Sequence, residues 1–275
     1  MLESVINISE GNKKSLIIEL KKVCSKSLLD VHVDRLHNRS VFTLAGENLI
    51  KDVKALVAGA TKEIDLTRHK GLHPRFGSVD VVPFIPIPGL AESNLSEAVI
   101  VRDEFIEWCN SELEIAAVPY EPEMTLPQVR KLLLNKRSDL VDQALIKPKS
   151  GVIAVGARRA LIAYNILVIG INLDDAKLIA SNLRSKELRI LSFSYEDMIQ
   201  ISCNLVAPWV LNPYHLYRAV HALVKDFGGS IISTELVGLM PKAVLNAIDA
   251  KYWGRLDIGL TKTIEYRLSQ SEANT

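Results

Sequence analysis

The sequence predicts a mixed α+β or α/β protein built from two ferredoxin-like split βαβ subdomains, with a ligand-binding groove between them. Three observations lead to this prediction. The length of 275 residues suits about two domains. Between residues 3 and 87 the apolar pattern changes in the order strand, helix, strand, strand, helix, strand. After residue 152 the same order of elements returns, without a strict sequence repeat.

The first half of the chain contains the clearest strand and helix patterns. Short apolar runs predict strands at residues 3–8, 28–33, 39–44 and 79–87. Apolar residues on one face predict helices over 13–24, which Asn12 would cap, and over 47–64. A helix over 95–113, a strand at 115–118 and a polar-faced helix over 129–140 are predicted to follow.

The predicted boundary between the subdomains is a break in this pattern near residue 147. Pro119, Pro122 and Pro127 mark a connecting segment, and the sequence IKPKSG at 146–151 marks a second break. We therefore expect subdomains at 1–147 and 148–275, with a linker from about residue 119. The second subdomain is predicted to contain an apolar region at 152–169, helices over 174–186 and 213–227, two strands within 188–205, a strand within 230–241 and a helix from Lys242.

The charge balance and the cysteine content favour a soluble cytoplasmic protein. With 33 basic and 32 acidic side chains the net charge is +1, so no overall field would attract nucleic acid or an anionic membrane. Cys24, Cys109 and Cys203 form neither a disulfide framework nor a zinc motif, which suits a reducing compartment. The sequence shows no signal-peptide pattern and no apolar run of about 18 residues. We expect neither a nucleic-acid nor a membrane partner.

A basic segment from Arg68 to Arg75 is the strongest candidate for a reactive site. It places His69 and His73 among Arg68, Lys70 and Arg75, shortly before a predicted buried strand. Imidazole can accept a proton near neutral pH, and the cations can bind carboxylates or phosphates. A titratable loop anchored to a rigid core strand is therefore predicted to be an active-site loop.

Other interpretations of the basic residues remain open. Two histidines four residues apart can bind a metal from a helix, but Gly71 and Pro74 disrupt a helix here and no third ligand is nearby. We therefore expect no metal. The segment could also be a solvated basic turn without function. The glycine and arginines at 156–159 lack the phosphate-loop and dinucleotide-binding patterns, so a nucleotide site has no support.

Several stretches together resemble the formiminotransferase family, the folate-dependent glutamate formimidoyltransferases. The matching stretches are INISEG (6–11), LLDVHVDRLHNRSVFTLAG (28–46), DLTRHKGLHPRFGSVDVVPFIPI (65–87), VGARRALIAYNI (155–166), ISCNL (201–205) and STELVGLMPKAVLNA (233–247). They extend over nearly the whole chain in the family's order. The resemblance implies two α/β subdomains around a groove for tetrahydrofolate, and a homodimer. It also implies transfer of a formimidoyl group between N5 of tetrahydrofolate, the co-substrate, and the amino group of glutamate.

The resemblance also implies roles for particular residues. The second histidine of the family's loop is the catalytic one, which here is His73, with His69 and Asn38 in supporting positions. A neutral imidazole would take a proton from the glutamate ammonium before its nitrogen attacks. The candidates for binding the carboxylates of glutamate and folate are Arg39, Arg68, Lys70, Arg75 and Arg158. The folate loop of the family corresponds to residues 139–151, with Asp142, Lys147, Pro148 and Gly151 as its candidates.

The sequence departs from the family pattern at three places. Leu72 stands where an acidic residue usually precedes the catalytic histidine. DLVDQALIKPKSG (139–151) replaces an Asp-Phe-Gly-Pro-like run, and PYEPEM (119–124) replaces a Gly-Glu-Ala segment. These departures leave two alternatives: a folate- or polyglutamate-binding protein without turnover, or a transferase with a different amine acceptor or a different donor, such as a formyl donor.

Overall fold

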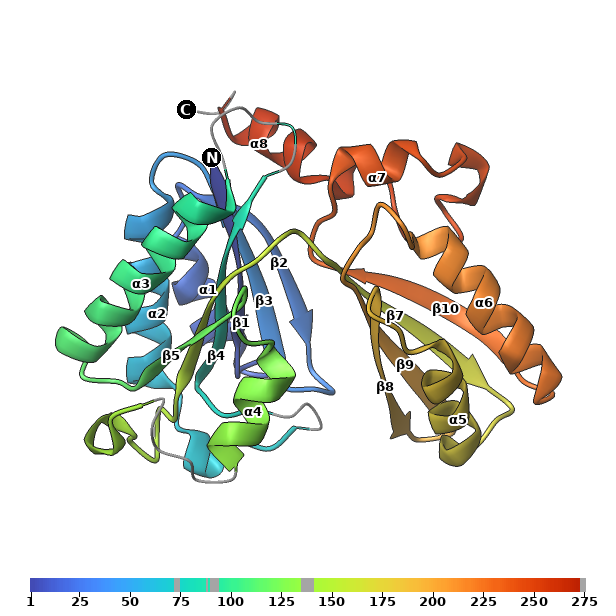
Figure 1. Cartoon of the computed structure of the whole chain (residues 1–275), viewed down its shortest axis with the longest axis horizontal. Coiled ribbons are helices and arrows are strands. Elements are labelled where there is room, and N and C mark those ends of the chain that lie inside the picture. Colours follow the sequence, from blue (N-terminus) through green and yellow to red (C-terminus); the bar gives the residue numbers. More distant parts are fainter. Residues whose placement is uncertain (72–74, 88, 90–93, 135–140, 273–275) are drawn as a thin grey trace. The chain divides into compact units, whose positions relative to one another are not determined.

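The computed structural model describes residues 1–71, 75–87, 89, 94–134 and 141–272, and it divides the chain into two compact units (Figure 1). The first unit contains Met1–Arg159 and the second contains Ala160–Ala273. Each unit has its own sheet and its own buried apolar residues. The mixed α/β class predicted from the sequence is confirmed.

The first unit begins with the predicted order of strand, helix, strand, strand, helix, strand. These elements are β1 (Leu2–Ile8), α1 (Lys14–Val23), β2 (Leu28–Asp34), β3 (Arg39–Ala45), α2 (Leu49–Glu63) and β4 (Val79–Pro86). The chain continues through α3 (Leu95–Ser111), β5 (Ala117–Tyr120), α4 (Leu126–Leu134) and β6 (Ile153–Ala157). Two 3₁₀ turns, η1 (Leu66–Arg68) and η3 (Gln143–Leu145), lie in the connections. Part of the helix predicted over 129–140 falls on residues 135–140, which are outside the described residues.

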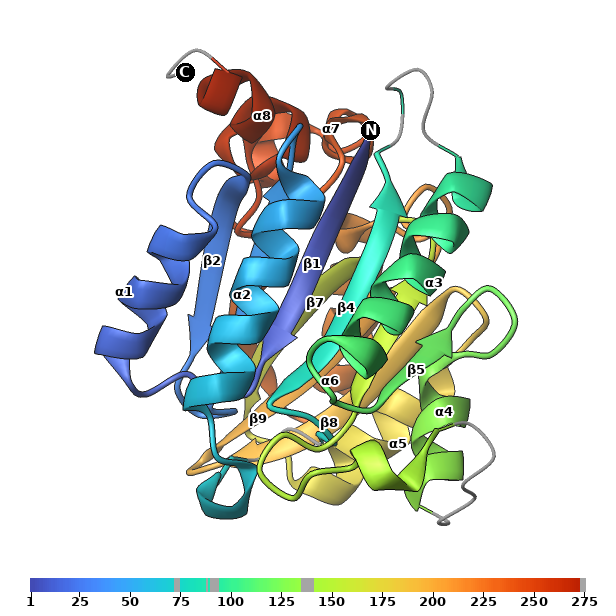
Figure 2. The ribbon, with the colours of Figure 1, turned by 90° about the vertical axis from the view of Figure 1, so that its left-hand side faces the viewer.

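The sheet of the first unit is mixed and has the order β2-β3-β1-β4-β6-β5. β1 is antiparallel to β3 and β4, whereas β4, β6 and β5 run parallel. Helices α1, α2 and α3 cover one face, which is turned toward the viewer in Figure 2. On the other face Val129 of α4 packs with Val81 and Ala154. Successive residues of β6 point to opposite faces of the sheet, so Ile153 and Val155 pack on the first face and Ala154 packs on the other.

The compact units divide after Arg159, later in the chain than the boundary predicted at 147 and 148. The reason is β6, which we expected in the second subdomain. In the structure β6 lies between β4 and β5, with Ala154 opposite both Val81 and Val118. Parallel neighbours are far apart in sequence, so the local pattern that predicts a strand does not predict which sheet receives it.

The second unit repeats the same order of elements around an antiparallel sheet. The elements are β7 (Ile162–Ile169), α5 (Leu173–Leu183), β8 (Leu188–Tyr195), β9 (Met198–Leu205), α6 (Pro213–Asp226) and β10 (Ser230–Val237). They are followed by α7 (Lys242–Asn246), η4 (Ala250–Tyr252), η5 (Leu260–Lys262) and α8 (Ile264–Glu272). The strand order is β10-β7-β9-β8. Ile179 of α5 and Val220 of α6 pack against Tyr164, Ile166 and Ile201 on one face of this sheet.

The starts of two helices test the predicted caps. Asn212 caps α6 as predicted, since its side chain accepts hydrogen bonds from the backbone N–H groups of Tyr214 and His215. The predicted Asn12 cap is wrong, because α1 begins at Lys14 without a side-chain cap. Glu10 instead holds the turn before the helix, because its Oε1 accepts from the N–H groups of Asn12 and Lys13 at 2.7 and 2.8 Å.

The three cysteines are free and buried, as the sequence predicted for Cys203. Cys24 and Cys109 belong to the core of the first unit, and Cys203 belongs to the core of the second. Burial raises the pKa of the Cys24 and Cys109 thiols to about 12 and also raises the pKa of the Cys203 thiol. Within the described part of the chain, the helices are too short or too polar to cross a membrane.

Candidate active site

Three segments that are distant in sequence meet at one end of the first unit's sheet, which we call the loop end. It is formed by residues 9–12 after β1, residues 35–38 between β2 and β3, and residues 65–71 and 75–78 before β4. They meet because β1 is antiparallel to β3 and β4, with Ile8 opposite both Ser40 and Val79. Ser9 joins the first segment to the third, since its N–H donates to the Ser78 carbonyl and its hydroxyl to the Gly77 carbonyl, each at 2.8 Å.

Asn38 connects all three segments of the loop end. Its side-chain oxygen accepts from the N–H of Gly11 at 2.9 Å, and its side-chain nitrogen donates to the carbonyl of Lys70 at 2.8 Å. Its own carbonyl oxygen lies 2.9 Å from Nε2 of His69. Asn38 has a φ of 47°, in the left-handed region that asparagine adopts more readily than most residues. The supporting position predicted for Asn38 therefore has a physical basis in its contacts.

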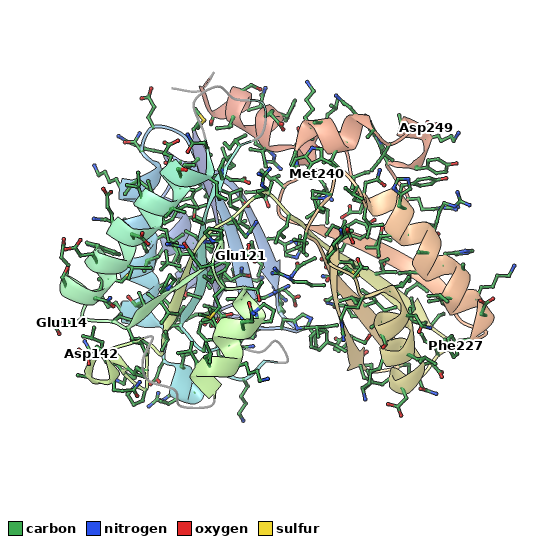
Figure 3. The ribbon with its side chains drawn as sticks, in the orientation of Figure 1. Glu114, Glu121, Asp142, Phe227, Met240 and Asp249 are labelled. Carbon is green, nitrogen blue, oxygen red and sulfur yellow. The ribbon has the colours of Figure 1, made fainter. Side chains whose placement is uncertain are left out.

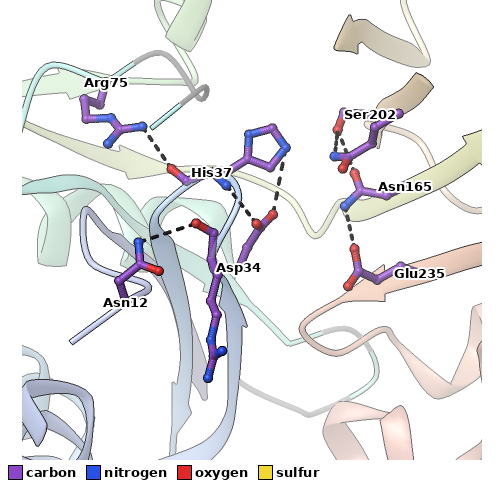
Figure 4. Close-up of polar contacts among 9 residues, drawn as sticks. Asn12, Asp34, His37, Arg75, Asn165, Ser202 and Glu235 are labelled. Atoms are coloured by element: carbon purple, nitrogen blue, oxygen red, sulfur yellow. Dashed lines mark hydrogen bonds and ion pairs between the residues drawn. The ribbon is translucent and has the colours of Figure 1, made fainter. Parts of the chain in front are cut away.

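The Arg75 guanidinium lies between His69 and the β2–β3 turn. Its Nη1 contacts the nitrogens of the His69 ring. Its Nη2 donates to the carbonyl oxygen of His37 at 3.0 Å, as Figure 4 shows. His37 is fully buried, and its N–H donates to Asp34 Oδ1 at 2.9 Å. Sequence analysis did not assign a role to His37. The Asp34-x-x-His37 spacing was a usable signal, because an Asp side chain often accepts from an N–H shortly after it in a turn.

The surroundings of His69 shift its pKa downward and so disfavour the protonated ring. Partial burial lowers the pKa of its imidazole, and the Arg75 guanidinium lowers it further, while the Asn38 carbonyl and the Glu10 carboxylate oppose the shift. An imidazole with its proton on Nε2 can donate to the Asn38 carbonyl and accept from Arg75 at Nδ1. Both ring nitrogens are therefore engaged, so His69 is suited to hold Arg75 in place rather than to exchange protons.

Gly71 permits the close approach of the basic segment to the β2–β3 turn. A Cβ atom at this position would overlap the carbonyl oxygen of His37 and would lie 2.8 Å from the Arg75 guanidinium. Leu72, His73 and Pro74 follow directly and lie outside the described residues. The assignment of His73 as the catalytic residue thus stays a prediction, with its neighbours Gly71 and Arg75 placed at the loop end.

The remaining predicted cations fall into different positions. Arg39 begins β3, near enough to Arg75 that its charge helps to lower the pKa of that guanidinium, after the larger effect of burial. Lys70 is exposed, and the Arg68 side chain is 88% exposed with its Nε 3.8 Å from Asp65. Arg158 lies elsewhere, as described next.

Arg158 lies at the opposite end of the sheet from the basic segment. It follows β6, and its N–H donates to the carbonyl of Phe84 near the end of β4 at 3.2 Å. Its side chain is almost fully buried, and Nη1 donates to the Arg159 carbonyl at 3.0 Å. The structure therefore groups Asn38, Arg39, His69 and Arg75 but does not group Arg158 with them.

A buried ion pair supports the segment that follows Arg75. The Asp80 side chain is only 6% exposed and accepts from Arg130 Nη2 of α4 at 2.6 Å. Its other oxygen accepts from the N–H of Phe76 at 2.8 Å, and the Arg130 guanidinium also covers the Phe76 ring. Sequence analysis missed this pair because it joins residues 50 positions apart.

The last residues of the predicted folate loop pack against residues that lie just before and just after the basic segment. Leu66 donates to the Lys149 carbonyl at 2.9 Å, Ser78 donates to the Ser150 carbonyl at 2.8 Å, and Gly77 bridges Gly151. Gly151 has a φ of 67°, and a Cβ atom there would overlap the Phe76 carbonyl oxygen. Gly151 is thus the predicted folate-loop residue that lies against the backbone of Phe76 and Gly77, directly after the basic segment.

The other predicted folate-loop residues are exposed and partly engaged in local structure. Asp142 caps η3 by accepting from the N–H of Ala144 at 2.9 Å. Lys147 Nζ lies 3.4 Å from a carboxylate oxygen of Glu114, and Figure 3 labels Glu114 and Asp142 on the same side of the first unit. Pro148 is exposed at the turn that follows.

A cavity of about 550 Å³ lies in the second unit, between α6 and β10. It is lined by Tyr217, His221, Lys225, Arg255 and by β10 residues from Ser230 to Thr234, among others. None of the predicted site residues lines it. Across the described residues no group of three His, Cys, Asp or Glu side chains could hold a metal ion.

Comparisons with known proteins find one family model and several curated relatives. The model described as "Formiminotransferase domain, N-terminal subdomain" matches residues 1–158. The glutamate formimidoyltransferase of Streptococcus pyogenes serotype M1 is 32% identical over 274 residues, which cover 89% of this chain and 90% of that protein. The glutamate formimidoyltransferase of Thermoplasma acidophilum is 31% identical, over 94% of this chain and 93% of that protein. The formimidoyltransferase-cyclodeaminase of Rattus norvegicus is 29% identical over 90% of this chain and 51% of that protein.

Proposed function

Because this chain belongs to the formiminotransferase family, we propose that it transfers a formimidoyl group between N5 of tetrahydrofolate and the amino group of glutamate. Tetrahydrofolate acts as co-substrate, and His73 acts as the general base. The carrying observation is the loop end, where Arg75, His69 and Asn38 join the three segments next to Gly71 and Arg75, the described residues on either side of His73 in the sequence. Two relatives that match nearly the whole chain bear the name glutamate formimidoyltransferase.

The proposed reaction moves one proton and exchanges one carbon–nitrogen bond for another. His73 accepts a proton from the glutamate ammonium, and the freed nitrogen forms a bond to the formimidoyl carbon. The tetrahedral adduct collapses by breaking the bond between that carbon and N5 of tetrahydrofolate. His73 then returns the proton to N5. A positioned general base contributes about 10²–10⁴-fold to such a step, and holding the amine against the carbon contributes on the order of several kcal/mol.

His69 supports this assignment by elimination. Its ring contacts the Asn38 carbonyl and the Arg75 guanidinium, and its pKa is lowered by burial. A ring that is already engaged on both sides is poorly placed to accept a proton from a substrate. His73 is the other histidine of the segment, and it occupies the position of the family's catalytic histidine.

The cations at the loop end provide the proposed binding groups for carboxylates. Arg75 is held by the carbonyl of His37 and by the His69 ring, so its guanidinium has a fixed direction. A fixed guanidinium binds a carboxylate through two parallel N–H donors. Arg39 stands beside it, and the exposed Arg68 and Lys70 can follow a longer anionic substrate such as a folate glutamyl tail. Arg158 lies at the other end of the sheet and is the least supported of the five.

One observation favours a second candidate function, a folate-binding protein of the same family without turnover. Leu72 replaces the acidic residue that usually precedes the catalytic histidine, which removes a carboxylate that would orient the ring. Such a protein would bind tetrahydrofolate and would leave formimidoylglutamate unchanged.

The resemblance to the family also leads us to propose a homodimer, which sedimentation velocity at two protein concentrations can test.

The test is a transfer assay with the purified chain, tetrahydrofolate and formimidoylglutamate, followed by mass spectrometry of both products. We expect turnover by the wild type and a loss of about 10²–10⁴-fold in kcat for His73→Ala, with tetrahydrofolate affinity kept within a few-fold. His215→Ala is the matched control, because His215 is an exposed histidine on α6 of the second unit. Equal rates for His73→Ala and wild type would remove His73 from the mechanism. Binding without turnover by the wild type would support the second candidate.

A further inference from the structure

A row of polar side chains crosses three neighbouring strands of the second unit. Glu235 on β10 is paired with Asn165 on β7, and Asn165 is paired with Ser202 on β9. Gln200 lies two residues along β9 on the same face of the sheet. Figure 4 shows Ser202, Asn165 and Glu235 in line. We call Gln200, Ser202, Asn165 and Glu235 the polar row.

The hydrogen bonds of the polar row all run in one direction. Gln200 Nε2 donates to the hydroxyl of Ser202 at 2.8 Å, and that hydroxyl donates to Asn165 Oδ1 at 2.7 Å. Asn165 Nδ2 then donates to Glu235 Oε2 at 2.8 Å. Because a hydroxyl has one proton, its donation fixes the Asn165 amide with the NH₂ group toward Glu235. The row thus orients an N–H donor onto one oxygen of a carboxylate.

The polar row lies on the face of the second unit's sheet that is opposite its apolar core. Tyr164 and Ile166 on β7 and Ile201 on β9 point to the opposite face, into the cluster with α5 and α6. Asn165 is nevertheless 2% exposed and Gln200 is 6% exposed. Burying amides in this way is unfavourable unless each is hydrogen-bonded, and apolar residues would pack at lower cost. A buried network that fixes the direction of a carboxylate is an arrangement suited to binding a ligand.

We infer that Glu235 is a recognition residue for a planar N–C–N edge that presents two N–H donors side by side. A carboxylate accepts two parallel N–H bonds from such an edge, as it does from a guanidinium. This inference rests on the proposed function. Two of the substrates in that function each contain one such edge. One source is the edge of the pteridine ring of tetrahydrofolate that carries N3–H and the 2-amino group. The other is the formimidoyl group of formimidoylglutamate, which is an amidine.

Asn165 and Ser202 are positioning residues under this inference, because they act on the ligand through Glu235. Ser202 fixes the Asn165 amide, and Asn165 fixes the carboxylate through its oriented N–H. Removing the Ser202 hydroxyl would let the amide rotate, so the carboxylate would lose its fixed direction while its charge stayed. The effect of Ser202→Ala on ligand affinity should therefore depend on whether Glu235 is present.

The experiment is isothermal titration of the full chain with three ligands: tetrahydrofolate, formimidoylglutamate and glutamate, which lacks the edge. We expect Glu235→Gln to weaken one of the first two by roughly tenfold to a hundredfold, the range for a lost charge-assisted pair, and to leave glutamate unchanged. A loss with tetrahydrofolate identifies the pteridine edge, and a loss with formimidoylglutamate identifies the formimidoyl group. Unchanged affinity for both would overturn the assignment.

Two controls separate recognition from a structural role. Glu196→Gln removes the same charge from an exposed position in the β8–β9 turn and should change no affinity. Ser202→Ala should weaken the same ligand in the wild type and have no further effect in the Glu235→Gln background. Equal effects in both backgrounds, or weaker binding of all three ligands with a lower melting temperature, would assign the row to folding alone.

The outcomes also separate this inference from the proposed reaction. If the wild type transfers the formimidoyl group and Glu235→Gln binds both substrates normally, the recognition role fails and the reaction stands. If the wild type does not transfer but Glu235→Gln weakens tetrahydrofolate binding selectively, the recognition role stands and the proposed reaction fails.

Discussion

At the scale of single residues, the candidate site depends on groups that hold other groups. Arg75 receives its direction from the His37 carbonyl and the His69 ring, and Asn38 holds the basic segment against the turn between β2 and β3. Sequence analysis could nominate Arg75 and His69 because charged residues stand out in the basic segment, whereas Asn38 was nominated through the resemblance to the family. It did not nominate His37: the Asp34-x-x-His37 spacing indicates the turn, but the contact of the His37 carbonyl with Arg75, 38 residues away, has no local signal.

The lowered pKa of His69 predicts how stability changes with pH. The folded ring resists protonation below its ordinary value of 6.5, whereas the ring of the unfolded chain does not. Above 6.5 both states are neutral, so the contribution to stability is complete. As the pH falls below 6.5 the unfolded state takes up the proton first, and the contribution is lost toward the folded pKa.

His69→Gln removes this titration and is the variant that measures it. The wild type should exceed His69→Gln in melting temperature at about pH 7.5, and the difference should narrow by about pH 5.5. Scanning calorimetry at several pH values measures both quantities, and His32→Gln on β2 provides a control histidine. A difference that widens on acidification would mean that the folded state prefers the protonated ring.

At the scale of elements, the caps show where local sequence is sufficient and where it is not. Asn212 precedes Pro213 at the first position of α6, a combination that both caps and starts a helix. Asn12 has the same residue type before α1, yet its side chain does not cap that helix. The signal differs because the 10–12 turn must also bring the Gly11 N–H to Asn38, so a contact distant in sequence decides the local geometry.

This difference gives a paired stability prediction for two asparagines. Asn212→Ala should reduce the free energy of unfolding by about 1 kcal/mol, because two helix N–H groups lose their acceptor. Asn12→Ala should stay within about 0.5 kcal/mol, because the Asn12 side chain makes only a long, exposed contact of 3.5 Å to the Arg35 carbonyl. Urea unfolding followed by circular dichroism measures both. Similar losses would mean that Asn12 does contribute to the start of α1.

At the scale of the whole molecule, the sequence predicted the class and the order of elements, and it could not predict pairings between distant strands. Short apolar runs in β1, β3 and β7 and one-sided apolar residues in α2 and α6 are local signals. The position of β6 depends on β4 and β5, which lie far away in the chain. The Asp80–Arg130 pair and the polar row have the same character, since their partners meet only in the folded sheet.

The buried thiols allow the opening of each unit's core to be measured separately. A thiol reacts with alkylating reagents as the thiolate, and burial keeps Cys24, Cys109 and Cys203 protonated and covered at neutral pH. Alkylation of the native protein should therefore be slow and should report the fraction of time that a core is open. Cys24 and Cys109 report on the first unit, and Cys203 reports on the second.

A cavity made in the second unit's core should therefore raise the alkylation rate of Cys203. Ile201→Ala removes a fully buried side chain beside Cys203 and should speed its alkylation by roughly tenfold or more, as expected for a large-to-small core change. Leu191→Ala, at a side chain that is 51% exposed on β8, should leave the rate unchanged. Peptide mass spectrometry after timed labelling reads each cysteine separately. The three native thiols thus make it possible to follow the transient opening of either core without adding a probe to the chain.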